Sequence, residues 1–410
     1  MSNVFSNIKD VGGIIAKAAS KEFADNLQFC KSIAKADASD YQGKNGYSAG
    51  DTLFISQPMR STPTSNFDQT SSIQDIVEPK VPLPLDIISS SAFAVDTEEF
   101  ASEIALGSLM KRVILPAVKD MAHDFENKVL TKATLNVANH VGTPGSTTFD
   151  TDTILAARDL MGKNLAPRDD NRYFLFDGTA GRKAVNARKG LFQSSEEISK
   201  QYKQGFVGIA DGYKWLESEM AISHTNGTDV TGVQVNATLS TEGAASMVVK
   251  GVANPGGTFT RGQVFTIAGV YAVHPVTKKQ YPFLQQFTVL ADVAGAAAAT
   301  RTVTFAPAIH TTGSLQNVSK FPTEDDNLVF VGTASETATQ NLAFHKNAFR
   351  LATVPLVMPK KAEFASQHNY QGMNIAVVYD WDQLKRRMIL RLDMLGALAI
   401  ERPEWSCRLS

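Results

Sequence analysis

The stretch from residue 225 to residue 332 constrains the fold of this chain more than any other part of it. It contains short runs of β-branched and aromatic residues, separated by Gly, Pro, Asn and Asp: SMVVK, QVFTIAGVY, QQFTVLAD, RTVTFAP and LVFVG. Short strands at such spacing predict a small antiparallel barrel or sandwich. Helical and strand signals are mixed both before it, at 150–222, and after it, from residue 341 onward. We therefore expect an α+β fold that carries an inserted, all-β barrel domain.

A long β-hairpin is predicted before this region. In GDTLFISQP, residues 50–58, Leu53 and Ile55 alternate with polar neighbours until Pro58 ends the pattern, as in a strand with one buried face. Residues 59–73 are mostly polar, and the prolines of the following SIQDIVEPKVPLPLDI exclude a helix. A two-stranded hairpin cannot bury both of its own faces. We expect it to lie on another surface, which in an assembly is an interface between subunits.

Two helical segments flank the hairpin. Apolar residues recur every three or four positions in residues 10–36, which predicts an amphipathic N-terminal arm. The stripe consists of Val11, Ile15, Ala19, Phe23, Leu27, Cys30 and Ala34. A longer helix is predicted from Asp96, which with Glu99 resembles a capping box, to Val129. Pro116 lies inside this helix and is expected to bend it. We expect the long helix to form the spine of the subunit.

Composition excludes several classes of protein. The 410 residues include 40 Lys and Arg against 41 Asp and Glu, so no net field attracts a polyanion or a membrane surface. Cys30 and Cys407 have the spacing neither of a disulfide framework nor of a metal site. The apolar segment from Val11 to Ala19 contains Lys17 and is too short to span a membrane. We expect a protein of a reducing cytoplasm that does not enter a membrane.

Motifs for catalysis and for metal binding are not found in the sequence. The seven histidines include no His-x-x-x-His pair, and there is no Cys-x-x-Cys, nucleophile elbow or dinucleotide fingerprint. His123 lies on the predicted long helix beside Met121 and Phe125, and we interpret it as a solvated histidine at the flank of the apolar stripe. Short basic clusters at 360–361 and 385–387 are interpreted as solvated faces or as contacts to acidic patches of sister subunits.

One turn resembles a phosphate-binding loop. Residues 177–183, DGTAGRK, follow a predicted strand at 173–176 and open a helix, as such loops do. Two residues rather than four separate the glycines, and Ala184 stands where Ser or Thr would bind magnesium. We interpret the segment as a tight turn capped by Asp177 or Thr179. We therefore assign no catalytic, metal-binding or cofactor-binding residue, and we expect a protein that is not an enzyme and uses no cofactor.

Several parts of the sequence resemble a known family. Residues 23–58, FADNLQFCKSIAKADASDYQGKNGYSAGDTLFISQP, resemble the arm-to-hairpin opening of tailed-phage coat proteins, in which an amphipathic helix leads through an Asp-Tyr segment into a Gly-Asp-Thr strand. Residues 261–292 and 302–309, RGQVFTIAGVYAVHPVTKKQYPFLQQFTVLAD and TVTFAPAI, look like the barrel insertion of the P22-like branch of that family. Residues 395–405, LGALAIERPEW, are similar to its closing strand.

The resemblance implies the Hong Kong 97-type capsid fold, and with it a division of the chain into five parts. We expect an N-terminal arm at 1–41, an extended hairpin loop at 42–92, a peripheral domain with the spine helix at 93–150 and about 343–385, an axial domain at 151–222 and about 386–410, and an inserted β-barrel domain at 223–342. In such a shell the barrel would lie on the outer surface.

The resemblance also implies a structural function. The chain is similar to the major capsid protein of a tailed bacteriophage, which assembles as pentamers and hexamers into an icosahedral shell around double-stranded DNA. The implied partners are other copies of the chain, a scaffolding protein and a portal protein, with the packaged DNA in weak, non-specific contact; a decoration protein is left open. In such families a procapsid forms first and expands as DNA enters. The implied locations are the virion capsid and, during assembly, the cytoplasm of the bacterial host.

Two segments are expected to contact neighbouring subunits, because many weak contacts per subunit sum to a stable shell. They are the arm, residues 10–36, and the hairpin tip, residues 59–73. Accordingly, Leu27→Asp is predicted to stop assembly and to leave a folded monomer. Phe265→Ala is predicted to lower folding yield more than it changes shell geometry, because Phe265 is expected in the barrel core.

Three alternative functions stay open at this point. An encapsulin-type nanocompartment shell has a related fold, but the barrel insertion argues against it. An enzyme with a noncontiguous Ser, His and Asp site is disfavoured by the motif search. A tail or adhesin protein fits the β insertion but not the spine helix.

Overall fold

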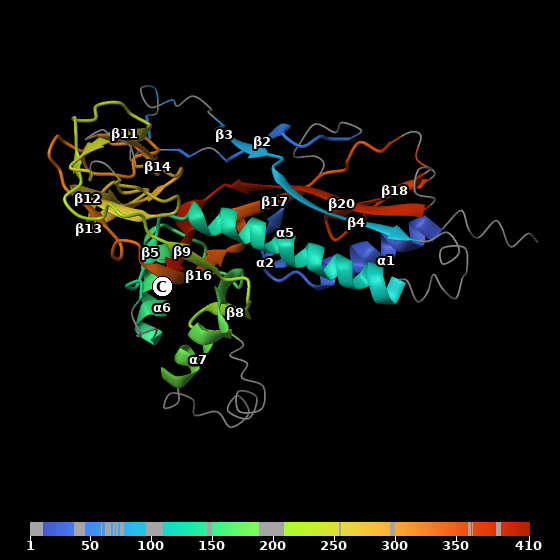
Figure 1. Ribbon diagram of the computed structural model, residues 1–410. Helices are drawn as coiled ribbons and strands as arrows, with labels where there is room; N and C mark the ends of the chain where they lie inside the picture. The colour runs from blue at the N-terminus through green and yellow to red at the C-terminus, as the bar shows by residue number, and fades with distance from the viewer. Residues whose placement is uncertain are drawn as a thin grey trace, which may run out of the picture. The chain divides into compact units, whose positions relative to one another are not determined.

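The computed structural model describes most of the chain. The described residues are 11–36, 46–58, 60–61, 67–68, 70, 73, 78–95, 110–145, 150–187, 209–253, 256–295, 300–359, 362, 364–382 and 387–410. The chain forms two compact units (Figure 1). The first comprises Met1–Gln57, Lys80–Leu130 and Phe349–Glu401, and the second comprises Pro58–Pro79, Thr131–Ala348 and Arg402–Ser410.

A six-stranded sheet forms the centre of the first unit. Its order is β1-β17-β20-β19-β18, and β4 pairs with β20 as well. The strands are β1 (Ala34–Lys35), β4 (Ile87–Val95), β17 (Phe349–Thr353), β18 (Phe364–Tyr370), β19 (Met373–Asp382) and β20 (Arg387–Ile400). Residues 394–399 of β20 are all buried, as expected for a central strand that is covered on both faces. Residues 387–400 therefore form one long strand.

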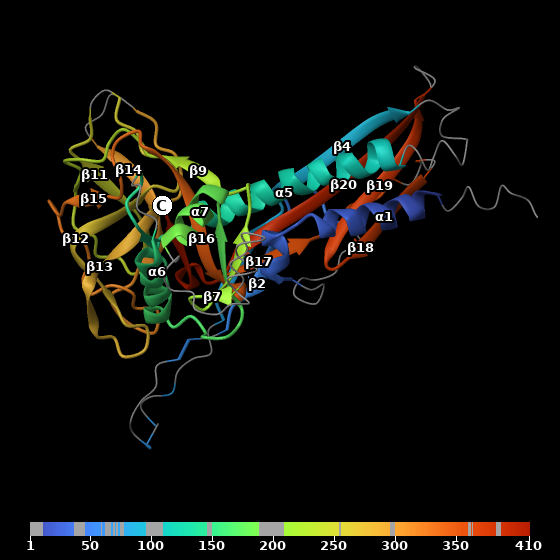
Figure 2. The same cartoon turned by 90° about the horizontal axis from the view of Figure 1, so that it is seen from below.

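Helices α1 (Val11–Asp25) and α5 (Leu115–Leu135) lie beside each other in the first unit (Figure 2). The rings of Phe23 in α1 and Phe125 in α5 are 5.8 Å apart and meet edge to face, and α1 packs on β18 and β19. The described part of the predicted long helix is confirmed, whereas its predicted start at Asp96 and Glu99 lies outside the described residues. The single arm helix predicted for residues 10–36 is wrong, because a break after α1 separates it from the short α2 (Phe29–Ser32).

The effect of Pro116 is visible directly before it. The segment η3 (Met110–Ile114) is a π-helix that leads into α5. A proline lacks the N–H that would bond to the preceding turn, and its ring crowds that turn. The wider π-helical turn is a common way to absorb such a disturbance.

The predicted hairpin is confirmed. Strands β2 (Thr52–Ser56) and β3 (Lys80–Pro84) pair antiparallel. Ile55 and Leu83 are buried in one cluster with Leu395 and Ala397 of β20. Gly396, between them, faces the other way, since a Cβ atom there would lie 2.7 Å from the ring of Phe125. The hairpin and α5 therefore cover opposite faces of the sheet.

The second unit contains a seven-stranded sheet of order β5-β21-β16-β6-β8-β7, with β9 also paired to β16. Its strands are β5 (His140–Val141), β6 (Arg172–Phe176), β7 (Ile209–Ala210), β8 (Tyr213–Glu217), β9 (Ile222–Thr225), β16 (Thr337–His345) and β21 (Ser406–Leu409). The helical segments are α6 (Thr151–Lys163), α7 (Gly178–Ala187), η4 (Lys346–Ala348) and η5 (Pro403–Trp405). The predicted strand at 173–176 and the helix after it are both confirmed.

The second unit also contains the predicted barrel. Its strands are β10 (Gln234–Val235), β11 (Ala244–Lys250), β12 (Val264–Val273), β13 (Gln280–Val289), β14 (Arg301–Ile309) and β15 (Leu328–Phe330), in the order β10-β11-β14-β13-β12-β15. The sheet closes because Leu328 N donates to Val233 O at 2.9 Å and Val235 N donates to Asp326 O at 3.0 Å. Each predicted β-branched run is one of these strands.

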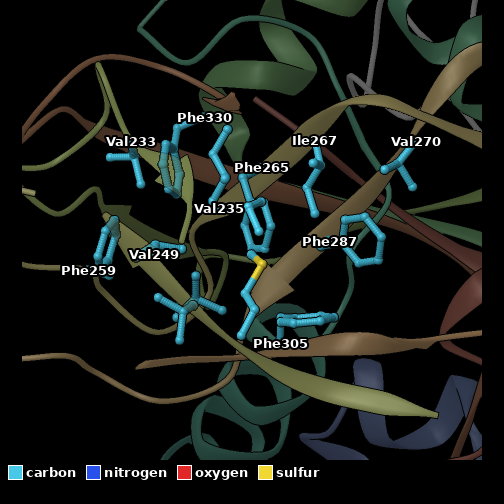
Figure 3. Packing of buried hydrophobic residues seen from close by; sticks show 14 of the residues in the cluster. Val233, Val235, Val249, Phe259, Phe265, Ile267, Val270, Phe287, Phe305 and Phe330 are labelled. Carbon is cyan, nitrogen blue, oxygen red and sulfur yellow. The ribbon is translucent and has the colours of Figure 1, made fainter. Parts of the chain in front are cut away.

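Aromatic rings fill the barrel interior (Figure 3). Phe265 is fully buried, and its ring lies 5.6 Å from those of Phe287 and Phe330 and 6.1 Å from that of Phe305. The prediction that Phe265 belongs to the core is confirmed.

The insertion has a simple geometric basis. Strand β9 leads into the barrel, and β16 follows the barrel. These two strands pair antiparallel, with Thr225 opposite Thr337 and Ile222 opposite Gln340. Because the two strands are neighbours, the chain leaves the sheet and returns to it at one place. The barrel can therefore be inserted there without disturbing the sheet.

The C-terminal segment differs from the expected assignment of 386–410 to one domain with 151–222. Strand β21 joins the sheet of β6 and β16, as expected. Strand β20 instead pairs with β4, β17 and β19 in the first unit. The long apolar run of β20 must be covered on both faces. In the first unit the hairpin covers one face of the six-stranded sheet and α5 covers the other. The other predicted domain boundaries stay predictions.

Candidate assembly surfaces

The turn at 177–183 is a capped turn. Asp177 Oδ2 accepts a hydrogen bond from Thr179 N at 3.2 Å, which confirms the predicted cap. A Cβ atom at Gly178 would lie 3.2 Å from carboxylate oxygens of both Glu217 and Glu219. These acidic groups occupy the positive end of α7, where a phosphate would otherwise bind.

The other residues considered for chemistry are dispersed. His123 is exposed, in agreement with its interpretation as a solvated histidine. In the described part of the chain, no three His, Cys, Asp or Glu side chains come together as a metal site would require. Cys30 and Cys407 are free and buried, and burial raises the pKa of each thiol, which makes both unreactive.

Of the two basic clusters, 360–361 and the first two residues of 385–387 lie outside the described residues. Arg387 Nε lies 3.6 Å from Asp382 Oδ2. This carboxylate belongs to the same chain, so Arg387 has an acidic neighbour without a sister subunit.

The apolar stripe of the arm is buried inside its own chain. Ile15, Ala19 and Phe23 are at most 1% exposed, and Leu27 is 2% exposed. The prediction that Leu27→Asp leaves a folded monomer is therefore wrong, because it would place a carboxylate in the core. The periodicity correctly indicated a buried face, but the surface that covers it belongs to the same chain and not to a neighbour.

A buried carboxylate fixes the end of the arm to the long helix. Glu126 of α5 accepts hydrogen bonds from the backbone N–H groups of Gln28, at 2.8 Å, and Phe29. Its side chain is almost fully buried, and burial raises its pKa. The carboxylate thus satisfies N–H groups at the start of α2, which have no partner within that short helix. This role was not predicted; the sequence signal that could have indicated it is an acidic residue directly after Phe125 of the apolar stripe.

The hairpin presents one open face. Phe54 points away from the buried side of β2 and is 57% exposed. Pro82, its partner on β3, is also exposed. Most of the predicted tip, 59–73, lies outside the described residues, but Arg60 forms an ion pair with Glu404 of the same chain. The outer face of the hairpin is therefore the best candidate for contact with another molecule.

A comparison with family models decides the identity. The model described as "P22 coat protein - gene protein 5" matches residues 6–407. The chain belongs to the P22 coat protein family. It is a major capsid protein of tailed phages, as the resemblance predicted, and its place is the virion. Self-assembly into a shell follows from this membership.

Solved structures similar to this coat protein come from several phages. A structure titled "Mycobacterium phage Che8" is 12% identical, with a TM-score of 0.45, over 93% of this chain and 90% of that chain. The "Capsid structure of the Cyanophage P-SCSP1u" is 12% identical, with a TM-score of 0.39, over 92% and 88%. The "CUS-3 coat protein I-domain" is 29% identical, with a TM-score of 0.18, over 25% of this chain and 96% of that chain. No curated protein matches the coat protein.

No helix among the described residues of the coat protein is long and apolar enough to cross a membrane.

Proposed function

We propose that this coat protein is a non-enzymatic subunit that assembles as pentamers and hexamers into the icosahedral shell around a double-stranded DNA genome. The observation that carries the proposal is the family match over residues 6–407. The order of the elements supports it: an arm, a hairpin, a long helix, an α+β region and an inserted barrel follow one another, as the Hong Kong 97-type fold requires.

The five-part division of the chain belongs to the same proposal. We assign the arm to 1–41, the extended loop to 42–92, the peripheral domain to 93–150 with about 343–385, the axial domain to 151–222, and the barrel to 223–342. Strand β20 is now added to the peripheral part because it pairs there with β17 and β19, whereas β21 stays with the axial part.

The proposed partners follow the family. A scaffolding protein and a portal protein guide assembly in the bacterial cytoplasm, and DNA enters a preformed procapsid. The charge balance of 40 basic against 41 acidic residues supports weak, non-specific contact with the packaged DNA, because a subunit that held DNA by charge would carry a basic excess. The two free, buried cysteines suit a reducing compartment.

Expression in bacteria tests the proposal. The full chain is produced alone and together with its scaffolding protein, and the soluble fraction is measured by light scattering and negative-stain microscopy. Closed shells, or irregular shells that become regular with scaffold, are the expected result. Shells that take up a portal protein at one vertex further distinguish a phage capsid from a nanocompartment. A compact monomer under all these conditions would disprove the proposal.

A further inference from the structure

We propose that acid separates the barrel from the seven-stranded sheet, because protonation of His140 and His224 beside Arg408 breaks the polar contact that joins them, while the barrel and the sheet each stay folded. We call His140, His224, Gln286, Thr288 and Arg408 the docking contact. The inference goes beyond the proposed function and does not depend on shell formation, since all of these residues lie in one compact unit of one subunit.

One barrel side chain pairs with the sheet much as another strand would. Gln286 Oε1 of β13 accepts a hydrogen bond from His140 N at 2.8 Å, and Gln286 Nε2 donates to His140 O at 2.9 Å. Two residues further along β13, Thr288 Oγ1 donates to Leu135 O, at the end of α5, at 3.2 Å. The backbone amide of His140 is therefore hydrogen-bonded to the barrel, and its protection from exchange reports whether the barrel is docked.

Three basic side chains from the sheet meet the barrel at Gly262. Arg408 Nη1 donates to Gly262 O at 2.7 Å. The ring of His224 borders the same residue, since a Cβ atom at Gly262 would lie 3.3 Å from His224 Nε2. This nitrogen also lies 2.9 Å from Arg261 O. With His140 on the neighbouring strand β5, one permanent and two potential positive charges are buried in the contact.

Little negative charge compensates these groups. The charged or titratable neighbours of His140 are Arg408 and His224, and those of His224 are Arg408 and Asp292. Among the described residues, the electrostatic neighbour of Arg408 is the thiol of Cys407 and not a carboxylate. A proton on either histidine would thus add a second positive charge beside a buried guanidinium, which is unfavourable in a medium of low polarity.

Docking is therefore linked to pH. Burial, together with the charges of Arg408 and His224, lowers the pKa of His140 to about 3. Burial and Arg408 also lower the pKa of His224, although Asp292 and the hydrogen bond to the backbone oppose this shift. Once separated, both histidines titrate near pH 6.5. The free energy of docking is fully present above that pH, and the docking constant falls about tenfold per pH unit below it for His140 alone.

The barrel and the sheet can separate without unfolding because each has its own core. Phe265 and Phe305 belong to the core of the barrel, and Phe174 and Trp215 belong to a different core beside the seven-stranded sheet. All five side chains of the docking contact are polar and lie in neither cluster. Separation therefore brings mainly polar groups into water, and it leaves the apolar clusters intact.

A second contact keeps the separated barrel near the sheet. Tyr281 Oη of β13 donates to Lys163 O, at the end of α6, at 3.1 Å. Lys163 Nζ lies 5.0 Å from the centre of the Phe283 ring. Burial raises the pKa of Tyr281 above its ordinary value, so this hydroxyl stays protonated in acid. We therefore expect a local opening at the docking contact and not a complete detachment of the barrel.

Amide hydrogen exchange of the soluble, full-length subunit tests the inference. Protection is measured relative to an unstructured peptide at the same pH, which removes the intrinsic effect of acid on exchange. The protection of the His140 amide should fall at least about tenfold between pH 7 and pH 5. The amides of Leu328, which donates to Val233 O in the barrel, and of Ser218, which donates to Phe176 O beside the sheet, should keep their protection.

Glutamine variants show whether the histidines are responsible. The double variant His140→Gln, His224→Gln keeps hydrogen-bonding side chains at both positions but cannot be protonated, so the amide of residue 140 should remain protected at pH 5. His310→Gln is the matched control, because His310 is a barrel histidine that lies 3.6 Å from Glu242 and outside the docking contact. It should lose protection as the unmodified chain does. Thermal unfolding at pH 7 checks that each variant is folded.

Three outcomes would overturn the proposal, and the first two require no variant. The His140 amide could keep its protection at pH 5, which would mean that acid does not open the contact. The amides of Leu328 and Ser218 could lose protection together with it, which would mean that acid unfolds the whole unit. The double variant could respond to acid as the unmodified chain does, which would assign the effect to other groups. The proposed function is tested separately by shell formation and stands in each of these cases.

Discussion

Arg408 donates a hydrogen bond from Nη1 to the carbonyl oxygen of Gly262 at 2.7 Å, which joins strand β21 to the segment that leads into barrel strand β12. Nη2 donates to Thr288 Oγ1 of β13 at 3.3 Å. The side chain is 1% exposed, and burial lowers its pKa to about 9, so it remains charged at neutral pH. A buried cation thus links the last strand of the chain to the inserted barrel.

We expect Arg408→Ala to lower the free energy of unfolding by about 3–5 kcal/mol, because it leaves a cavity and two acceptors without a donor. Urea unfolding followed by circular dichroism measures the change. Arg391→Ala is the matched control: its side chain is 60% exposed in an ion pair with Asp393, and its removal should cost about 0–1 kcal/mol. Equal losses in the two variants would contradict a structural role for Arg408.

His140 makes the same region sensitive to acid. Burial, with the positive charges of Arg408 and His224 nearby, lowers its pKa to about 3, and its Nε2 lies 2.7 Å from Ser410 Oγ. In the unfolded chain a histidine titrates near pH 6.5. The folded state therefore binds fewer protons than the unfolded state between these two values. Stability is present above about pH 6.5 and is lost as the pH falls toward 3, by about 1.4 kcal/mol per pH unit.

His140→Gln isolates this contribution. Between pH 6 and pH 4 its free energy of unfolding should fall less steeply than that of the unmodified chain, by about 1.4 kcal/mol per pH unit. His123→Gln, at an exposed position, controls for the loss of a histidine as such. Parallel pH curves for His140→Gln and the unmodified chain would show that His140 is not kept neutral by the fold.

The sequence predicted the elements whose formation depends on local pattern. The barrel strands are short apolar runs between turn residues, and Phe265 belongs to the core of the barrel. The hairpin follows from the alternation of Leu53 and Ile55 and from the prolines of β3. Such patterns report which face of an element is buried, because burial of alternate or every third to fourth residue follows directly from backbone geometry.

The sequence could not show which surface covers a buried face. Leu27 lies in an apolar stripe, but only the fold reveals that its own chain buries it. The roles of Glu126 and Arg408 depend on partners 97 and 146 residues away. Charged residues are usually exposed, so their burial is predictable only once those distant partners are known.

Glu126 allows two substitutions with different outcomes. Glu126→Ala leaves the N–H groups of Gln28 and Phe29 without an acceptor and should cost about 1–3 kcal/mol. Glu126→Gln keeps an oxygen acceptor and removes a charge whose burial is unfavourable, since burial raises the pKa of the carboxyl. Its cost should therefore be smaller, and it should decrease relative to the unmodified chain as the pH rises from the ordinary carboxyl pKa to the raised pKa, because over this range the unfolded state ionises before the folded state.

Hydrogen exchange identifies the site of the Glu126 effect. In Glu126→Ala the amides of residues 28–30 should exchange faster than in the unmodified chain, whereas those of the barrel should not change. Faster exchange throughout the chain would indicate general destabilisation. It would contradict a local effect of the hydrogen bonds that Glu126 of α5 accepts from Gln28 and Phe29.

Phe265→Ala tests whether the barrel is a separate determinant of folding. The substitution removes a ring that packs against Phe287, Phe305 and Phe330, and it should cost about 3–5 kcal/mol. Soluble yield should fall steeply, but the protein that does fold should build shells of normal diameter, because the ring lies inside the barrel and touches no outer surface. Val329→Ala, on β15 but 58% exposed, should change stability by at most about 0.5 kcal/mol. If soluble Phe265→Ala protein instead builds shells of altered diameter in negative-stain images, the barrel core influences subunit geometry as well as folding.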